Sequence, residues 1–279
     1  MRTVDNAAIA QAGARRFRSE YHYALFEYLR SAKVIEAVER AGVRIAGRVL
    51  DSGCGGGGTA LSLAEEAGFT VGLDVEPAFS AGRRLAAERA IANVGFVQGD
   101  GTHLPFRGSS FDLVLSHSVI EHLPSAPAYL GECLRVLRNG GILYLSTAPY
   151  LSMAGAHLPR LRLPIPLHLV LGRRLAFLCF RGLARHAPWA LKEPRDANTF
   201  VALAEQGRTK QDDLRQRITV RRLGAWIRAS GFEILREECH PAGIFRRFLP
   251  DPARRVLGRL PWARDVMVAQ IQYVLARPR

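Results

Sequence analysis

Apolar residues follow two different spacings that alternate along most of the chain. Residues 17–38 carry apolar side chains three and four positions apart, a pattern typical of an amphipathic helix. From residue 48 onward, short apolar and β-branched runs alternate with helical patterns, which predicts βαβ units and a parallel sheet with right-handed crossovers. The predicted strands are 48–51, 69–74, 94–98, 111–117 and 141–147, and the predicted helices between them are 58–67, 78–92 and 126–138.

The alternation stops near residue 150 and resumes near residue 219. A helix is predicted to begin at Thr219 and to end at Gly231, and residues 232–235 and 266–275 supply two more strands. The sequence therefore predicts an α/β protein with a seven-stranded, doubly wound, Rossmann-like sheet and an insertion after the fifth strand. Four regions follow from this: a helical cap (1–46), the core (47–150), a basic and apolar helical insertion or lid (151–218) and the C-terminal part of the core (219–279).

The first predicted strand ends in an acidic residue followed by a glycine-rich turn. Residues 48–58 read Arg-Val-Leu-Asp-Ser-Gly-Cys-Gly-Gly-Gly-Gly. Glycines let the backbone take positive φ and approach a ligand closely, and the following helix presents free N–H groups to that ligand. The spacing also fits the dinucleotide fingerprint, but Asp51 at the strand end would repel a pyrophosphate. A ligand with a cationic head fits this carboxylate better, and a turn with only a packing role is the remaining alternative.

Polar residues also follow the other predicted strands. Asp74 ends the second strand, where an acidic side chain can accept ribose hydroxyls; capping of the next helix is the alternative. Asp100 follows the third strand, Ser116 is the second-last residue of the fourth, and Glu121 and His122 come shortly after it. Ligands of doubly wound sheets bind beyond the carboxyl ends of the strands, so these residues are expected at one edge.

In this order and spacing, residues 47–148 resemble the methyltransferase 11-type subfamily of class I S-adenosylmethionine (SAM)-dependent methyltransferases, with a weaker resemblance over 219–276. The resemblance implies a mostly parallel sheet whose last strand is antiparallel, with SAM as the cofactor. It implies that the carboxylate of Asp51 lies near the methionine ammonium and that the glycines of the loop line the methionine portion. The carboxylate of Asp74 would hold the ribose. Asp100 with Gly101 would contact the adenine. The expected cofactor-binding residues are Asp51, Gly53, Cys54, Gly55, Gly57, Asp74, Asp100, Gly101 and Ser116.

Glu121 and His122 are the candidate catalytic residues. A sulfonium methyl is already activated, so the protein mainly aligns the acceptor and excludes water. An acceptor atom of high pKa also needs a base, and His122 is placed for that role unless the segment only shapes the pocket wall. Some quinone-ring O-methyltransferases that the chain resembles carry Glu-x-x-Glu-His and bind a divalent metal with it. Here Ser118 replaces the first glutamate, so no metal site is predicted.

The helix at 17–38 is expected to close the cofactor site, with Tyr21 or Tyr23 near the methyl group. Scattered cysteines without a C-x-x-C pair predict neither disulfides nor a zinc site. No apolar run reaches the ~18 residues of a spanning helix, and the start of the chain does not read as a signal peptide. A cytoplasmic location is therefore expected.

The formal charge is +14, and lysine occurs at only three positions, so nearly all basic residues are arginine. A GC-rich coding background favours arginine codons and is one explanation of this bias. A basic protein also binds anions, so the charge is compatible with nucleic acid, anionic lipid or phosphorylated molecules as partners. Between Cys133 and Lys192 there is no acidic residue. Residues 161–180 are strongly apolar within this basic stretch, which suits a segment lying on an anionic membrane surface. A lid whose leucines bury against the sheet is the alternative.

The sequence thus predicts a SAM-dependent methyltransferase of a small-molecule acceptor, hydrophobic or lipid-linked acceptors included. Transient contact with the inner face of the membrane is part of this prediction. An RNA methyltransferase is one alternative, but the chain has neither an appended RNA-binding module nor a basic stripe interleaved with aromatic residues, so nucleic acid is not the expected partner. A non-catalytic SAM-binding partner subunit is the other, and the intact glycine-rich loop does not favour it.

Overall fold

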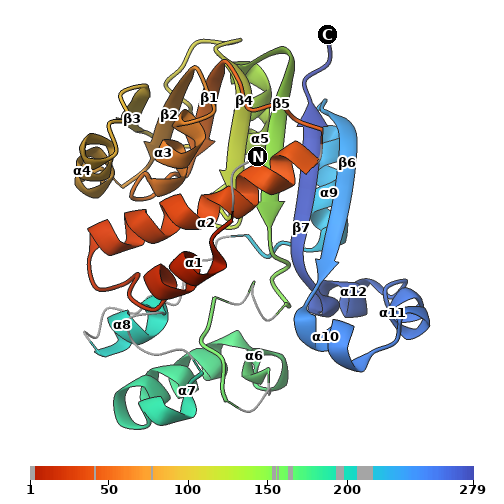
Figure 1. Cartoon of the computed structure of the whole chain (residues 1–279). Helices are drawn as coiled ribbons and strands as arrows, with labels where there is room; N and C mark the ends of the chain where they lie inside the picture. The colour runs from red at the N-terminus through yellow and green to blue at the C-terminus, as the bar shows by residue number, and fades with distance from the viewer. Residues whose placement is uncertain are drawn as a thin grey trace.

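A single seven-stranded sheet organises the chain, in the order β3-β2-β1-β4-β5-β7-β6 (Figure 1). β7 runs antiparallel to both β5 and β6, while β1 to β5 pair in parallel, which confirms the predicted fold class. The strands are β1 (Arg48–Ser52), β2 (Phe69–Asp74), β3 (Val94–Gln98), β4 (Phe111–His117), β5 (Leu137–Thr147), β6 (Glu233–Pro241) and β7 (Val268–Ala276). This computed structural model describes residues 4–40, 42–76, 78–152, 155, 157–162, 166–192, 198–205 and 216–279.

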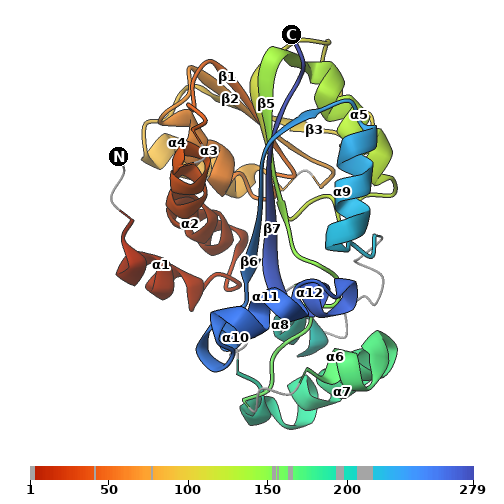
Figure 2. The ribbon, with the colours of Figure 1, turned by 90° about the vertical axis from the view of Figure 1, so that its right-hand side faces the viewer.

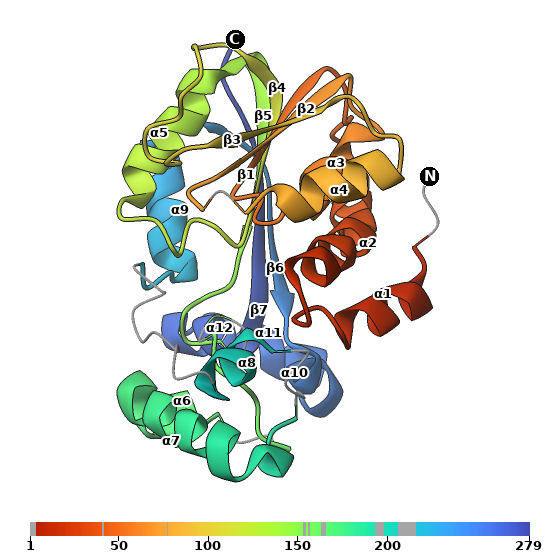
Figure 3. The same ribbon diagram turned by 90° about the vertical axis from the view of Figure 1, so that its left-hand side faces the viewer.

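Helices cover both faces of the sheet. Figure 2 views the sheet edge-on, with α2, α3 and α4 on one face and α5 and α9 on the other, and Figure 3 shows the same layers from the opposite side. The helices of these layers and the N-terminal one are α1 (Asn6–Gly13), α2 (Glu20–Arg40), α3 (Gly58–Ala64), α4 (Ser80–Glu88), α5 (Ala126–Val136) and α9 (Val220–Ala229). The others are α6 (Leu167–Val170), α7 (Gly172–His186), the 3-10 helix η1 (Pro188–Ala190), α8 (Thr199–Glu205), α10 (Gly243–Phe248), α11 (Asp251–Leu257) and α12 (Pro261–Met267).

The apolar run in β4 explains how the sheet is buried on both faces. Val114 belongs to the cluster beneath α5 and α9, which includes Tyr129 and Ile227. Leu113 and Leu115 belong to the cluster on the opposite face, beneath α2. Successive side chains of a strand point to opposite faces, so a central parallel strand must be apolar at consecutive positions.

The sequence placed several element boundaries incorrectly and missed several short elements. The helix α5 ends at Val136 rather than at residue 138, because Leu137 already pairs with Phe111 in the first rung between β4 and β5. The helix α1 lies in the segment that the sequence showed only as a polar start. Three short helices, α10 to α12, connect β6 to β7 where the sequence showed only an arginine- and proline-rich stretch.

The inserted segment after β5 has a small core of its own. Ala176, Phe177 and Phe180 of α7 are buried against Leu158 and Val201, and this cluster consists only of residues from the insertion. Residues 153, 154, 156, 163–165, 193–197 and 206–215 of the insertion lie outside the described residues. The insertion and the α10–α12 segment both lie beyond the carboxyl ends of the parallel strands (Figures 1 and 3). Within the described chain, none of the helices has the length and apolar character to cross a membrane.

Candidate active site

The loop after β1 needs glycine for two separate reasons. Gly53 has φ +79°, and a Cβ there would lie 2.3 Å from Cγ2 of Val119. Gly57 has φ +87°, and a Cβ there would lie 2.4 Å from Cε1 of Phe96. Both positions therefore combine a left-handed backbone with a close neighbour that leaves no room for a side chain. The contact at Gly53 also joins this loop to the loop that follows β4.

β2 holds the same loop in place from the side. The carboxylate of Asp74 accepts hydrogen bonds from the backbone N–H of Gly55 at 2.8 Å and of Glu76 at 3.0 Å. The carbonyl of Leu73 accepts the N–H groups of Gly53 and Cys54 at 2.7 and 3.0 Å. The loop is thus fixed by β2 before any ligand binds, which is the preorganisation a tight ligand site requires.

Asp51 is a buried carboxylate at the end of β1, only 3% exposed. Its Oδ2 has no hydrogen-bond partner among the described residues. Burial raises the pKa of Asp51 to about 8, and repulsion from Glu27 and Asp74 adds to the rise. Glu27 and Asp74 therefore lie near enough to Asp51 to raise its pKa, and Glu27 itself pairs with Arg30 at 2.7 Å. A ligand carrying an ammonium and a sulfonium group would meet an unpaired acceptor there, so these residues fit SAM.

α2 closes the site from above, and the structure distinguishes its two candidate tyrosines. Cε1 of Tyr23 lies 3.8 Å from the position of a Cβ on Gly55, so this ring lies beside the glycine loop. Tyr21 instead donates a hydrogen bond of 2.5 Å to Glu88 on α4, and its ring faces that helix. Tyr23 is therefore the residue of this pair that borders the cofactor loop.

The loop after β3 is ordered by Asp100. Its Oδ1 accepts hydrogen bonds from both the backbone N–H and the hydroxyl of Thr102 at 2.8 Å. A Cβ on Gly101 would lie 3.2 Å from the ring of Tyr129, so this turn packs tightly on α5. Ser116 is fully buried on β4, opposite Ser52 of β1. The ribose role of Asp74, the adenine role of Asp100 and Gly101, and the cofactor contact of Ser116 stay predictions.

The three histidines near strand ends are separated by the fold. His103 has an 86% exposed side chain and lies 4.0 Å from Asp100. Nε2 of His117 lies 3.4 Å from Arg30 on α2, and burial, assisted by this guanidinium, lowers the pKa of His117 to about 4. His122 lies in the loop after β4, beyond the strand end. Of these three histidines, only His122 lies close to Glu121 and His157.

The loop after β4 brings Glu121 and His122 to the same edge through a strained turn. Ser118 adopts φ +57°, an uncommon conformation for a residue other than glycine. Glu121 is 3% exposed, and its Oε2 accepts a 2.9 Å hydrogen bond from the Thr147 hydroxyl at the end of β5. Burial raises the pKa of Glu121.

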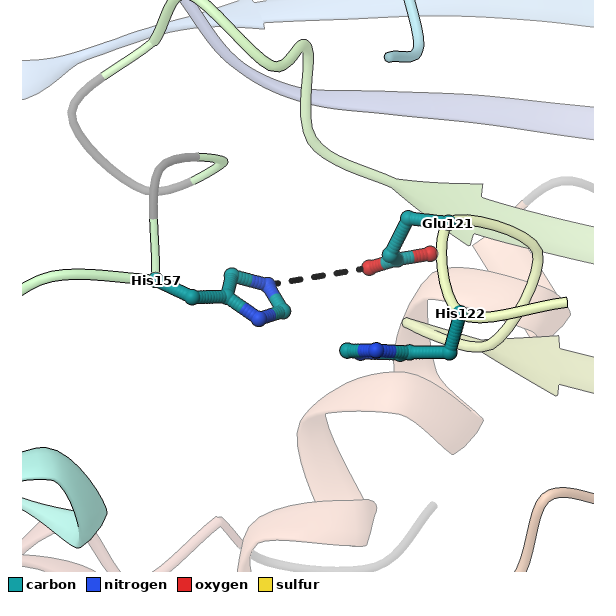
Figure 4. Close-up of side chains that lie close together, drawn as sticks. All are labelled: Glu121, His122 and His157. Atoms are coloured by element: carbon teal, nitrogen blue, oxygen red, sulfur yellow. Dashed lines mark ion pairs between the residues drawn. The ribbon is translucent and has the colours of Figure 1, made fainter. Parts of the chain in front are cut away.

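A histidine from the insertion completes this group. Nε2 of His157 lies 3.9 Å from Oε1 of Glu121, and the rings of His157 and His122 have centroids 5.0 Å apart (Figure 4). Burial lowers the pKa of His157 to about 4. The sequence analysis missed His157, because no spacing rule connects a residue of the insertion to the loop after β4.

Comparisons with known proteins agree with this geometry. Residues 50–145 match the family model described as a methyltransferase domain. A probable S-adenosylmethionine-dependent methyltransferase of Mycolicibacterium smegmatis is 39% identical over 110 residues, which are 39% of this chain and 41% of that protein. A phthiotriol/phenolphthiotriol dimycocerosates methyltransferase of Mycobacterium leprae is 39% identical over 99 residues, which are 34% of this chain and 36% of that protein. The chain thus spans about two fifths of the length of these curated relatives.

A comparison of structures extends the likeness beyond the matched core. The crystal structure of a putative methyltransferase from Bacillus halodurans superposes with a TM-score of 0.53 at 15% identity, covering 89% of this chain and all of that one. At this identity the likeness concerns the fold alone. It agrees with the seven-stranded topology.

Proposed function

We propose that this chain transfers the methyl group of SAM to a hydrophobic small-molecule acceptor, because its residues 50–145 form a class I SAM-dependent methyltransferase domain. The observation that carries the proposal is the buried Asp51 carboxylate at the end of β1, one of whose oxygens has no hydrogen-bond partner among the described residues. A pocket built for a phosphate would present a cation or bare N–H groups at this position instead.

Each part of the site has a task in this reaction. Bound SAM supplies an electrophilic methyl group on a sulfonium. Asp51 pairs with the cationic head, and Asp74 holds the loop and accepts from the ribose. Tyr23 covers the loop and excludes water from it. His122, beside the buried Glu121, contacts the acceptor and takes its proton as the new bond forms.

The acceptor class is inferred from the surface around the site. One relative is named for phthiotriol and phenolphthiotriol dimycocerosates, and we extend hydrophobic acceptors to this chain. Large apolar side chains are exposed on both segments beyond the strand ends, and we call this surface the amphiphilic end. Its exposed apolar residues are Val170, Leu171, Leu175, Leu178, Trp189, Ile244, Phe248, Val256, Leu260 and Trp262. Its exposed arginines are Arg174, Arg181, Arg185, Arg246, Arg247, Arg255 and Arg259.

This composition supports transient contact of a cytoplasmic protein with an anionic membrane. Each arginine near such a surface contributes about 1 kcal/mol, and the apolar side chains add burial in the lipid interface. Phe248 and Trp262 are 72% and 64% exposed, so replacing both by serine should not disturb the core. The double variant should sediment less with anionic vesicles than the wild type does. Equal sedimentation of both proteins, or equal sedimentation with zwitterionic vesicles, would contradict membrane contact.

The reaction itself is tested by capture of the acceptor. Purified protein is incubated with methyl-labelled SAM and an extract of the source cells, and the products are partitioned. Label in the organic phase that is absent with Asp51→Asn supports the proposed function. Label in RNA, or no label although calorimetry shows SAM binding, would contradict it.

A further inference from the structure

Three metal-ligating side chains converge where the insertion meets the loop after β4. One ligand atom each from Glu121, His122 and His157 lies within 4.8 Å of the other two (Figure 4). The first two come from the core, and the third comes from the inserted segment. Side chains from separate parts of the chain therefore point at one small volume.

The carboxylate in this group is built into the protein rather than placed on its surface. Glu121 is 3% exposed, and the Thr147 hydroxyl fixes its Oε2, so that Oε1 points toward His157. Metal-binding carboxylates are commonly oriented by such a hydrogen bond on the other oxygen. Among the described residues, no lysine or arginine forms an ion pair with Glu121. A buried carboxylate is costly unless it takes up a proton or a cation binds beside it.

We propose that Glu121, His122 and His157 bind one divalent transition-metal ion of the zinc or manganese class. This inference rests on the proposed function and assigns the chemistry of the same site. Two imidazole nitrogens with one carboxylate suit such ions better than Mg²⁺, which prefers oxygen ligands. Three protein ligands leave coordination positions open, as in catalytic metal sites.

The distances allow this assignment with small side-chain movements. Two ligands at about 2.1 Å from a tetrahedral ion lie about 3.4 Å apart. Nε2 of His157 and Oε1 of Glu121 are 3.9 Å apart, and all three ligand atoms lie within 4.8 Å of one another, so movements of roughly 0.5 to 1.4 Å would close the set. Arg173 lies near enough to His157 to lower its pKa, and its charge opposes a cation. The Glu121 carboxylate, 3.9 Å from His157, offsets that repulsion.

The metal would change the assignment of roles in the site. An ion with open positions lowers the pKa of a bound acceptor hydroxyl, so His122 would serve as a ligand and not as the base. The sequence predicted no metal site because it counted only two ligands in this loop. The third ligand arrives with the insertion, so metal binding would also fix the insertion against the core.

Cobalt titration of the untagged, chelator-treated full-length protein tests the proposal, with visible d–d absorption as the readout. One Co²⁺ per chain is expected, and Zn²⁺ should displace it. Loss of a residue that only orients a metal ligand typically weakens metal binding by about 10- to 100-fold. His157→Ala removes a ligand itself, so it should weaken Co²⁺ binding by at least ~10-fold. His186→Ala is the matched control, because this exposed histidine of α7 belongs to the same insertion but not to the cluster.

Absence of Co²⁺ binding to the wild type would overturn the proposal, and so would equal binding by wild type and His157→Ala. Circular dichroism of each variant separates loss of a ligand from loss of folding. SAM binding, measured by calorimetry on the same metal-free samples, separates the two proposals. Intact SAM binding and methyl transfer without metal would refute the metal site alone, whereas failure to bind SAM would refute the proposed function.

Discussion

Replacing Asp51 by asparagine should weaken SAM binding and stabilise the empty protein at the same time. The side chain keeps its shape, but the charge that pairs with the cationic ligand is lost. Removing one partner of a buried charge pair costs about 2 kcal/mol or more, which is at least ~30-fold in Kd.

The gain in stability follows from the pKa of Asp51, which is raised from 3.8 to about 8 in the folded protein. Between these two values the unfolded chain has lost the proton and the folded protein has kept it, so stability falls as pH rises through this window. At pH 7 the loss is roughly 4 kcal/mol, at about 1.36 kcal/mol per pH unit. An asparagine has no such loss, although its unpaired amide costs about 1–3 kcal/mol.

The net stabilisation of the empty variant is therefore about 2 kcal/mol at pH 7, which raises Tm by roughly 4–8 °C. Scanning calorimetry at pH 5 and pH 7 should show the advantage shrinking at the lower pH, and titration calorimetry gives the affinity for SAM. Asp112→Asn is the matched control, because Asp112 pairs with Arg138 away from the glycine loop and should affect only stability, downward. Unchanged SAM affinity in Asp51→Asn, or a lower Tm than that of the wild type, would refute the reasoning.

Three further predictions concern the same site. SAM should bind to ionised Asp51, so SAM binding near pH 7 should release protons, and the affinity should rise as pH rises toward about 8. Calorimetry in buffers of different ionisation enthalpy measures the proton release, and its absence would contradict the prediction. Gly53→Ala should abolish SAM binding and lower Tm, because φ is +79° and a Cβ there has no room. Gly131→Ala is the control: a Cβ at this position of α5 meets no neighbour, so it should raise stability by about 1 kcal/mol, and thermal unfolding of both variants measures the difference. Thr147→Val leaves an oxygen of buried Glu121 without its hydrogen-bond donor, so it should cost about 1–3 kcal/mol of stability and weaken Co²⁺ binding about 10- to 100-fold. Denaturant unfolding and the cobalt titration measure these effects, and an unaffected variant would contradict the role of this hydrogen bond.

The sequence predicted those parts of the molecule that local patterns determine. Consecutive apolar residues such as Leu113 and Val114 identify a central strand, and the glycine spacing after Asp51 identifies a tight turn at the strand end. The side chains brought together by the insertion could not be predicted in this way. His157 reaches Glu121 only through the tertiary position of a segment whose own core is made within the insertion.

A second group of misses has a different physical cause. The choice between Tyr21 and Tyr23 depends on how α2 is rotated against the sheet, and neighbouring helical positions do not reveal that rotation. The helices α10 to α12 are short and have no buried stripe long enough to give a clear period. Helices this short are not stable in isolation, so their formation depends on the rest of the fold, including the strands β6 and β7 that they connect.

The position of β7 has a consequence for how the protein folds. β7 lies between β5 and β6, so β6 has no other strand beside it within the described sheet. During synthesis the residues of β6 leave the ribosome before their only partner exists, and they must wait unpaired until residues 268–276 emerge. The charged side chains of that unpaired strand, Arg236, Glu237 and Glu238 among them, disfavour association with another chain during the delay. Completion of the sheet is therefore one of the last events of folding, and loss of the final strand would remove two strands rather than one.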